Sequence, residues 1–148
     1  MRLEYSVVLN REDEGGYSVS FPDFPEAFTQ GEREEEALSA AIDCLEEAIA
    51  NRIALKMDIP VPSASTGHFV VPVTPRAAFA AAVYMGMKEH HLTRVQVAAQ
   101  VGVDEKQIRR LLDPYHNSRL KATESVLSAV GKRVVVSIED LEPDPCLV

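Results

Sequence analysis

The sequence is poor in cysteine and in long apolar runs. Its two cysteines, Cys44 and Cys146, lie too far apart to suggest a zinc site or a disulfide framework, which indicates two free thiols. No apolar run approaches the ~20 residues that a membrane span needs, and the first residues, MRLEYSVVLNRED, lack the apolar core of a secretory signal. These absences predict a cytoplasmic protein that does not enter a membrane.

Groupings that could support catalysis are also missing. Residues 12–14 are all acidic but fall at a predicted hairpin tip, and Asp23 and Asp43 alone are too few for a metal-assisted nuclease. The four histidines are isolated or, at 90–91, adjacent, so a helix would point those two apart. We therefore predict no catalytic residue, no metal site and no cofactor, in a protein that is not an enzyme.

Charge is distributed unevenly along the chain. The formal net charge is -8 and the pI is near 5.0. Residues 1–66 hold 5 Lys and Arg against 14 Asp and Glu, whereas residues 87–133 hold 9 against 5. An acidic first half and a basic second half indicate two surfaces that suit partners of opposite charge.

The first 73 residues predict a small module of strands and one helix. Apolar residues alternate over 3–9 and 17–21, which predicts two strands joined by a hairpin at Gly15-Gly16. A short third strand is expected at 27–30, a helix over 34–53, and a fourth strand at 69–73 after a linker rich in proline and serine. The predicted fold class is α+β: a β-β-β-α-β module, then an all-helical domain with a short C-terminal strand.

The second half, residues 74–141, carries the pattern of a helix-turn-helix. Ala98 supplies the small residue that the crossing of two helices requires, and Gly102 supplies the turn. T-x-x-Q at 93–96 and D-x-x-Q at 104–107 fit capping boxes that would start the two helices. The agreement between core spacing, turn and caps favours a DNA-binding domain.

The second helix of this motif would point charged side chains away from its core. With Ile108 and Leu111 inward, arginine and lysine side chains face out, where they suit guanine edges or phosphates of double-stranded DNA. The first helix would offer backbone amides to a phosphate. The candidate DNA contacts are Thr93, Gln96, Glu105, Lys106, Arg109, Arg110, Asn117 and Arg119.

The chain ends in a β-branched run and an acidic tail. The run KRVVVSIED has no neighbouring strand in sequence, so we expect it to pair with the same segment of a second chain. Pairing of this strand with the N-terminal sheet is the alternative. Residues 142–148 are predicted to be a separate acidic tail. The predicted dimer contacts are Val134, Val135, Val136 and Ile138.

Four short motifs in the first module resemble those of HicB antitoxins. In order, they are Gly16-Tyr17, Asp23-Phe24-Pro25, Thr29-Gln30-Gly31 and Glu36-Ala37-Leu38. Residues 92–138 are similar to the lambda-repressor-like helix-turn-helix that one branch of this family carries, although Arg94 stands where many such domains have glutamine. The resemblance covers nearly the whole chain.

The resemblance implies an antitoxin of a type II toxin-antitoxin system. The first module, a degenerate ribonuclease H-like fold, would bind and block a small HicA toxin that cleaves RNA, and the second would bind the operator of its own operon. Homodimers or homotetramers are expected. An acidic surface would meet a basic toxin through electrostatic complementarity. The candidate toxin contacts are Asp23, Phe24, Glu32, Glu34 and Glu35.

Two other functions fit parts of the pattern. A free-standing transcriptional regulator would use the first module to sense a small molecule, but 9 aromatic residues leave few to line a pocket. A nuclease would need a set of carboxylates that the sequence lacks. A short, basic protein encoded in the adjacent reading frame would favour the antitoxin.

Overall fold

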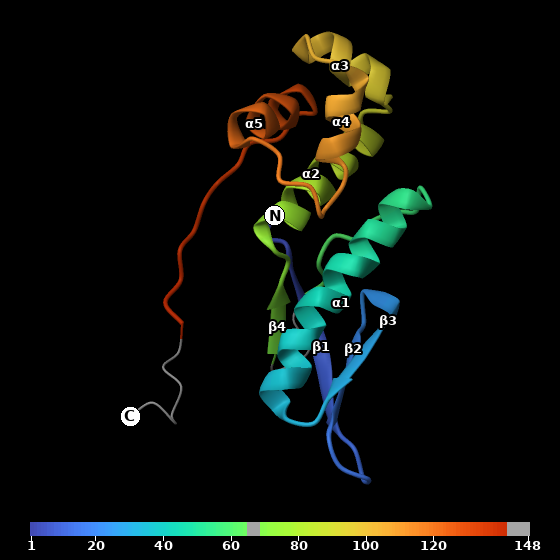
Figure 1. Cartoon of the computed structure of the whole chain (residues 1–148), viewed down its shortest axis with the longest axis vertical. Coiled ribbons are helices and arrows are strands. Elements are labelled where there is room, and N and C mark those ends of the chain that lie inside the picture. The colour runs from blue at the N-terminus through green and yellow to red at the C-terminus, as the bar shows by residue number, and fades with distance from the viewer. Residues whose placement is uncertain (65–68, 142–148) are drawn as a thin grey trace.

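The computed structural model describes residues 1–64 and 69–141, which form a sheet with one long helix, followed by four helices (Figure 1). The predicted α+β class and the β-β-β-α-β order of the first module are confirmed. None of the helices in these residues combines the length and the apolar character needed to cross a bilayer. The elements are β1 (Glu4–Arg11), β2 (Tyr17–Phe21), β3 (Phe24–Gly31), α1 (Glu34–Ala54), β4 (Phe69–Pro72), α2 (Pro75–Glu89), α3 (Arg94–Val101), α4 (Glu105–Leu111) and α5 (Leu120–Ala129).

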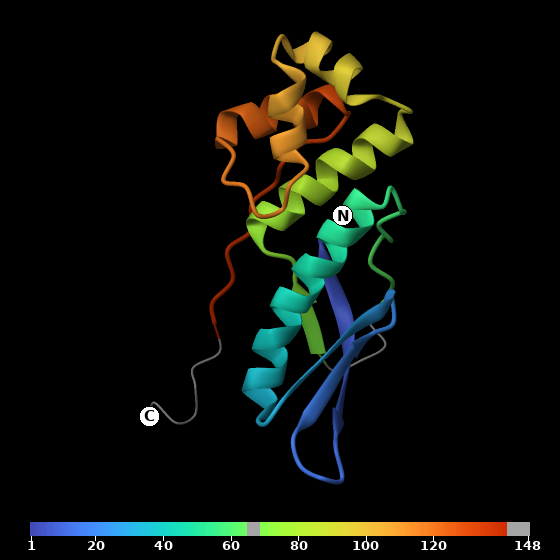
Figure 2. The same ribbon diagram turned by 45° about the vertical axis from the view of Figure 1, so that its right-hand side comes forward.

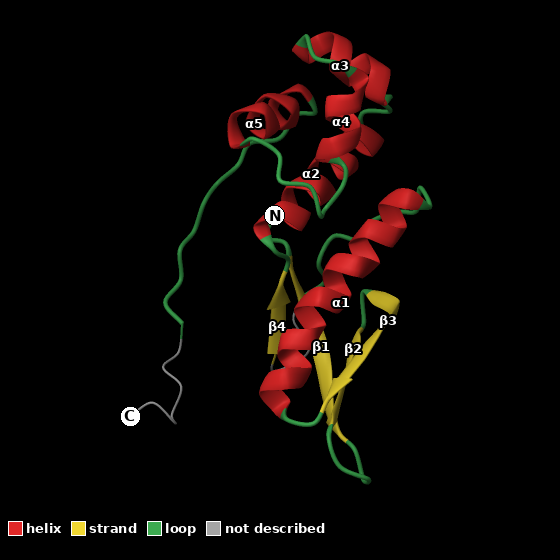
Figure 3. Cartoon of the chain, viewed as in Figure 1, coloured by secondary structure: helices red, strands yellow, loops and turns green. Residues whose placement is uncertain are grey.

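The four strands form one antiparallel sheet in the order β3-β2-β1-β4, and α1 covers one face of it (Figure 3). Alternate residues of the strands point toward α1, as a strand with one buried face requires. Tyr5 and Val19 on that face are fully buried, and so are Ala41 and Leu45 of the helix. The alternation seen in the sequence therefore marks the face that builds the core.

Strand β3 is longer than the predicted 27–30. It begins at Phe24, and the pairing with β2 shifts register between Ser20 and Phe21. Pro25, which cannot donate a backbone hydrogen bond, lies within it because β3 is an edge strand with one unpaired side. The proline that suggested a turn therefore marks an edge of the sheet.

Gly31 explains one of the sequence motifs in packing terms. A Cβ at this position would lie 2.5 Å from the backbone nitrogen of Ala37, in the first turn of α1. Only glycine lets the end of β3 approach the start of the helix so closely. The Thr29-Gln30-Gly31 motif thus fixes where α1 begins against the sheet.

Helix α2 belongs to two hydrophobic cores at once. Ala77, Ala81 and Tyr84 pack into the core of the sheet and α1, whereas Val83 and Met87 pack into the core of α3, α4 and α5. A helix that is apolar on all sides is buried on all sides, as this one is. The predicted boundary between residues 73 and 74 therefore precedes a helix that both modules share (Figure 2).

The two predicted capping boxes differ in outcome. In α3 the Thr93 Oγ1 accepts from the Gln96 N–H at 3.2 Å and the Gln96 Oε1 accepts from the Thr93 N–H at 2.9 Å, so this box is confirmed. The box predicted for Asp104 and Gln107 is wrong. The Asp104 carboxylate instead accepts from the Lys106 N–H at 3.0 Å, because its short side chain bonds the backbone two residues on. Gly102 ends α3 with φ 77°, as predicted for the turn.

The predicted C-terminal strand is not formed within one chain. After α5, residues 132–141 run back toward the N-terminal module, where Glu139 forms an ion pair with Arg2 (Figure 1). None of the described residues pairs with this segment in a β ladder. A ladder needs an unpaired edge beside it, so pairing with a second chain stays a prediction.

The contact between α2 and α5 yields a test of the shared helix. A Cβ on Gly86 would lie 2.6 Å from Cγ2 of Val130, so we expect Gly86→Ala to lower the free energy of unfolding by about 1–3 kcal/mol. In a helix with free space at this position, glycine to alanine would raise the free energy of unfolding by roughly 0.5–1 kcal/mol. Whether this free energy falls or rises therefore distinguishes close packing from free space. Urea denaturation measures the effect.

Val130→Ala provides the control, because it removes the nearest clashing atom. Gly86→Ala should cost less in that background than in the natural sequence. A Gly86→Ala variant as stable as the natural chain would show that α2 and α5 are not held this closely.

Candidate nucleic-acid interface and acidic surface

Helices α3 and α4 form the predicted helix-turn-helix. Val97 and Ala98 of α3 pack with Ile108 and Leu111 of α4, and all four are buried. Helix α5 closes this core through Val126, Leu127 and Val130, and α2 supplies its other wall. The core spacing predicted from the sequence is therefore confirmed, and it sets which side of α4 faces outward.

The outward side of α4 is basic. Lys106, Arg109 and Arg110 are exposed, and Glu105 is half-buried, whereas Ile108 is completely buried. Neither Lys106 nor Arg110 makes a side-chain hydrogen bond or ion pair with another described residue. Their charges remain available to an anionic partner.

Glu105 joins the two helices through a pair of ion pairs. Its carboxylate lies 3.2 Å from Nε of Arg94 in α3 and 2.8 Å from Nη2 of Arg109 in α4. The sequence predicted Glu105 as a direct DNA contact, but the geometry shows a carboxylate that holds two arginines from different helices. Arg94 was not among the predicted contacts, since its pairing joins residues 11 apart that meet only once α3 and α4 have packed.

The remaining predicted DNA contacts fall into two groups. Thr93 and Gln96 are exposed at the start of α3, where their acceptor oxygens are used by the cap. Asn117 lies at the other end of α4, where its Oδ1 accepts from Nη1 of Arg76 at 3.2 Å. Arg119 is exposed at the start of α5. The ion pairs to Glu105 bring Arg94, the residue after Thr93, toward Arg109.

The first turn of α1 and the β1–β2 hairpin form an acidic surface. Glu32, Glu34 and Glu35 are exposed there, as predicted, and a hollow of about 670 Å³ beside them is lined by Glu12, Glu14, Glu32 and Glu36. The Arg33 guanidinium donates to the Glu36 carboxylate at 2.8 Å and lowers its pKa. Glu32, Glu34 and Glu35 have no ion pair with another described residue, so this acidic surface can accept basic side chains.

Two of the predicted toxin contacts, Asp23 and Phe24, make contacts within the chain itself. Phe24 is completely buried and packs edge-to-face against Tyr5, with ring centroids 4.9 Å apart, so its side chain offers no surface to a partner. Asp23 accepts hydrogen bonds from the backbone N–H and the hydroxyl of Ser63, both at 3.0 Å. The Asp23-Phe24-Pro25 motif therefore anchors the linker and the core, and Phe24 is removed from the contact surface.

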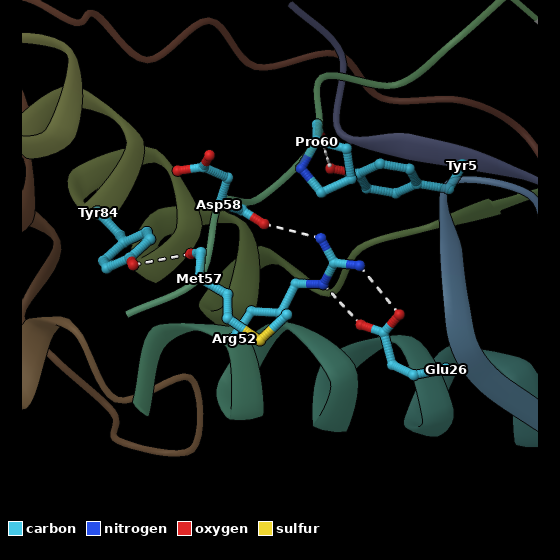
Figure 4. A network of polar contacts seen from close by, with 7 residues as sticks. All are labelled: Tyr5, Glu26, Arg52, Met57, Asp58, Pro60 and Tyr84. Atoms are coloured by element: carbon cyan, nitrogen blue, oxygen red, sulfur yellow. Dashed lines mark hydrogen bonds and ion pairs between the residues drawn. The ribbon is translucent and has the colours of Figure 1, made fainter. Parts of the chain in front are cut away.

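Arg52, near the end of α1, holds the linker that follows the helix (Figure 4). Its guanidinium donates to both carboxylate oxygens of Glu26, at 2.6 and 2.9 Å, and to the carbonyl of Asp58 at 2.8 Å. The same group lies 4.8 Å from the centre of the Phe24 ring. Hydrogen bonding to Arg52 lowers the pKa of Glu26, which keeps this pair charged.

Two tyrosines hold the same linker from other elements (Figure 4). Tyr5 of β1 donates to the carbonyl of Pro60 at 2.7 Å, and Tyr84 of α2 donates to the carbonyl of Met57 at 2.8 Å. Burial raises the pKa of Tyr5 to about 12, so its hydroxyl remains a donor at neutral pH. The sheet, α1 and α2 are thus fixed to one short segment. The sequence carried no local signal of this network, because its partners are distant along the chain.

Across residues 1–64 and 69–141, no three His, Cys, Asp or Glu side chains group closely enough to hold a metal ion. The Cys44 thiol lies 3.6 Å from the carbonyl oxygen of Phe28, and burial raises its pKa, which disfavours the reactive thiolate. The geometry instead presents an acidic surface and a basic helix at opposite ends of the long axis (Figure 1).

Comparison with known proteins gives matches over most of the chain. The model of a family described as HicB-like antitoxin of bacterial toxin-antitoxin system matches residues 4–75. Antitoxin HicB 1 of Photorhabdus laumondii is 35% identical over 137 residues, which cover 93% of this chain and 88% of that protein. Antitoxin HicB of Escherichia coli K12 is 34% identical over 135 residues, or 89% and 96% of the two chains. Antitoxin HicB of Pseudomonas fluorescens is 28% identical over 139 residues, or 93% and 94%.

Proposed function

Because the chain belongs to the HicB family of antitoxins, we propose that it neutralises a HicA-type RNA-cleaving toxin and represses its own operon by binding operator DNA. The observation that carries this proposal is the placement of opposite charges. The start of α1, which carries exposed glutamates, lies at one end of the molecule, and α4, which carries exposed basic residues, lies at the other (Figure 1). An RNA-cleaving toxin needs a basic surface to hold its substrate, and DNA is acidic, so each partner has a complementary end.

For DNA, we assign α4 as the helix that enters the major groove. Lys106, Arg109 and Arg110 would contact bases or phosphates, and Glu105 would hold Arg94 and Arg109 in place between the two helices. Thr93 and Gln96 at the start of α3 would contact a phosphate through their free donors. Asn117 and Arg119 would contact the neighbouring backbone.

Arginine substitutions on α4 test this assignment. We expect Arg109→Ala and Arg110→Ala each to weaken operator binding by about 1–3 kcal/mol, because a bidentate contact to a base contributes that much discrimination. Fluorescence anisotropy with the operator and with a scrambled duplex measures the loss and its dependence on sequence. Toxin neutralisation should be unchanged.

Two further variants calibrate the same assay. Glu105→Gln should reduce the preference for operator over scrambled duplex, since Arg94 and Arg109 lose their shared anchor. Arg11→Ala, which removes an exposed cation at the end of β1, should leave the preference unchanged. Natural affinity in both arginine variants would refute α4 as the recognition helix.

We assign the acidic surface at the start of α1 as the toxin-binding surface, with Asp23 as a neighbouring contact. Replacing Glu32, Glu34 and Glu35 by lysine should slow association with the toxin, with a smaller defect at high salt, because exposed charges are screened within about 8 Å at physiological ionic strength. Stopped-flow mixing of the two purified proteins at two salt concentrations measures the rate.

A charge reversal elsewhere on the chain tests whether the slower association comes from the acidic surface or from the change in net charge alone. Glu124→Lys changes an exposed carboxylate on α5, outside the acidic surface, and should leave the association rate nearly unchanged. Melting temperatures of the natural chain and of the triple variant test whether the variant remains folded after the loss of acidic residues from the first turn of α1. An association rate that is unaffected by the triple reversal would place the toxin elsewhere.

Assembly into a homodimer or homotetramer would supply the second DNA-reading helix. Proteins of this kind read half-sites about 34 Å apart by pairing two motifs around a two-fold axis. Val135, Val136 and Ile138 are 80%, 75% and 88% exposed in the single chain, whereas Val134 packs against the helical core. We propose that this segment pairs antiparallel with its copy, which would cover these side chains.

Truncation after Gly131 tests the pairing. We expect the shortened chain to lose the C-terminal dimer contact, and to bind the operator more weakly because one motif alone makes few contacts. Multi-angle light scattering and an operator titration report the two effects. A shortened chain that keeps both the natural mass and the natural affinity would show that the dimer surface lies elsewhere.

A further inference from the structure

An apolar groove lies between the end of α1 and the helix-turn-helix, and the proposed function uses only its rim at Thr93, Arg94 and Arg109. Its volume is about 910 Å³, and its apolar lining includes Ile53 of α1, Tyr84 and Met87 of α2, Leu112, and Tyr115. Grooves of about 300–1,000 Å³ at the junction of two modules, lined mainly by apolar and aromatic side chains, are typical of small-molecule sites. A ligand here would contact both modules at once.

The charged groups around this groove are mostly basic. Lys56, Lys88, Arg94 and Arg109 line it, together with His91, against a single carboxylate from Asp113. Three of the cations already pair with carboxylates outside the groove, Lys88 with Asp58 and both arginines with Glu105. Lys56 has no ion pair with any described residue. The four cations exceed the carboxylates of Asp58, Glu105 and Asp113 by one charge, so the groove favours an anionic ligand.

The backbone at Lys56 and His91 supports a role for their side chains. They are the two non-glycine residues with positive φ in the described chain, at 58° and 52°, each just after a helix that borders the groove. After α3 and α5 the equivalent positions are Gly102 and Gly131, with φ 77° and 79°. Glycine adopts this conformation at least cost. The chain thus keeps a basic or titratable side chain at the two positions beside the groove.

We propose that this groove binds a small hydrophobic carboxylate, with its apolar body against Tyr84, Met87 and Leu112 and its anionic group beside Lys56 and His91. A neutral ligand would leave Lys56 without an anionic partner, and a basic partner such as the expected toxin would be repelled by it. The proposal does not depend on toxin or DNA binding, so it can be tested on the full-length protein alone.

Two fluorescent probes with similar aromatic rings, one anionic and one neutral, distinguish the contribution of charge to binding affinity from that of apolar burial. We expect anilinonaphthalene sulfonate to bind one site about tenfold more tightly than neutral N-phenylnaphthylamine, because the anionic group gains a charged partner. Dodecanoate, a hydrophobic carboxylate without fluorescence, should displace the sulfonate. Equal affinity for the two probes, or no displacement by dodecanoate, would overturn the proposal.

Glycine substitutions locate the site. Lys56→Gly with His91→Gly should weaken sulfonate binding about tenfold, since the anion loses the Lys56 ammonium and the hydrogen-bonding His91 ring. The melting temperature should be retained or raised, because glycine relieves the positive φ. Asparagine, which also tolerates this conformation, gives a second pair of variants if the glycine pair folds poorly. Lys121→Ala, an exposed cation on α5 outside the groove, is the control and should bind normally. Folded variants at both positions that keep the natural affinity would overturn the proposal.

Discussion

The structure depends on the burial of α2 between two cores. Its apolar residues are distributed around the whole helix, so neither the sheet module nor the three following helices can form a closed core without it. Gly86 allows Val130, the residue after α5, to approach on one side, and Tyr84 fixes the linker after α1 on the other. The acidic surface and the basic helix α4 are therefore parts of one packed body rather than two domains on a flexible tether.

The elements that could be predicted from the sequence are those set by local patterns. Alternation located the strands of the hairpin, three-and-four spacing located α1, and the Thr93 cap and Gly102 located α3 and its turn. The extent of β3 was missed because Pro25 is a turn signal in sequence but is also tolerated at a sheet edge, and edge position is a property of the assembled sheet. The Asp104 cap was predicted with the wrong partner because Gln107 matched the motif but does not bond back.

The candidate sites were predictable as regions more than as contacts. The distribution of charge along the sequence located both the acidic and the basic surface. Residues that are close in sequence on a helix or in a hairpin are also close in space, so a charged stretch of sequence becomes a charged patch. Burial and pairing are long-range properties, and they changed the assignment of particular residues: Phe24 is part of the core, and Glu105 pairs with Arg94 and Arg109. The groove beside Lys56 and His91 had no sequence signal, because its walls come from segments that meet only after folding.

The sharing of α2 limits how this protein can exchange parts with its relatives. A recombination point before residue 75 would place a helix from another protein against the sheet. That helix would have to pack against the sheet and α1 as Ala77, Ala81 and Tyr84 do, and also against its own helical partners. A point after residue 89 would impose the converse demand on α3 and α5. New combinations of the sheet module and the helical module therefore require compatible surfaces on both faces of a single helix, whereas changes on the outward side of α4 alter the surface of the helical module without disturbing either core.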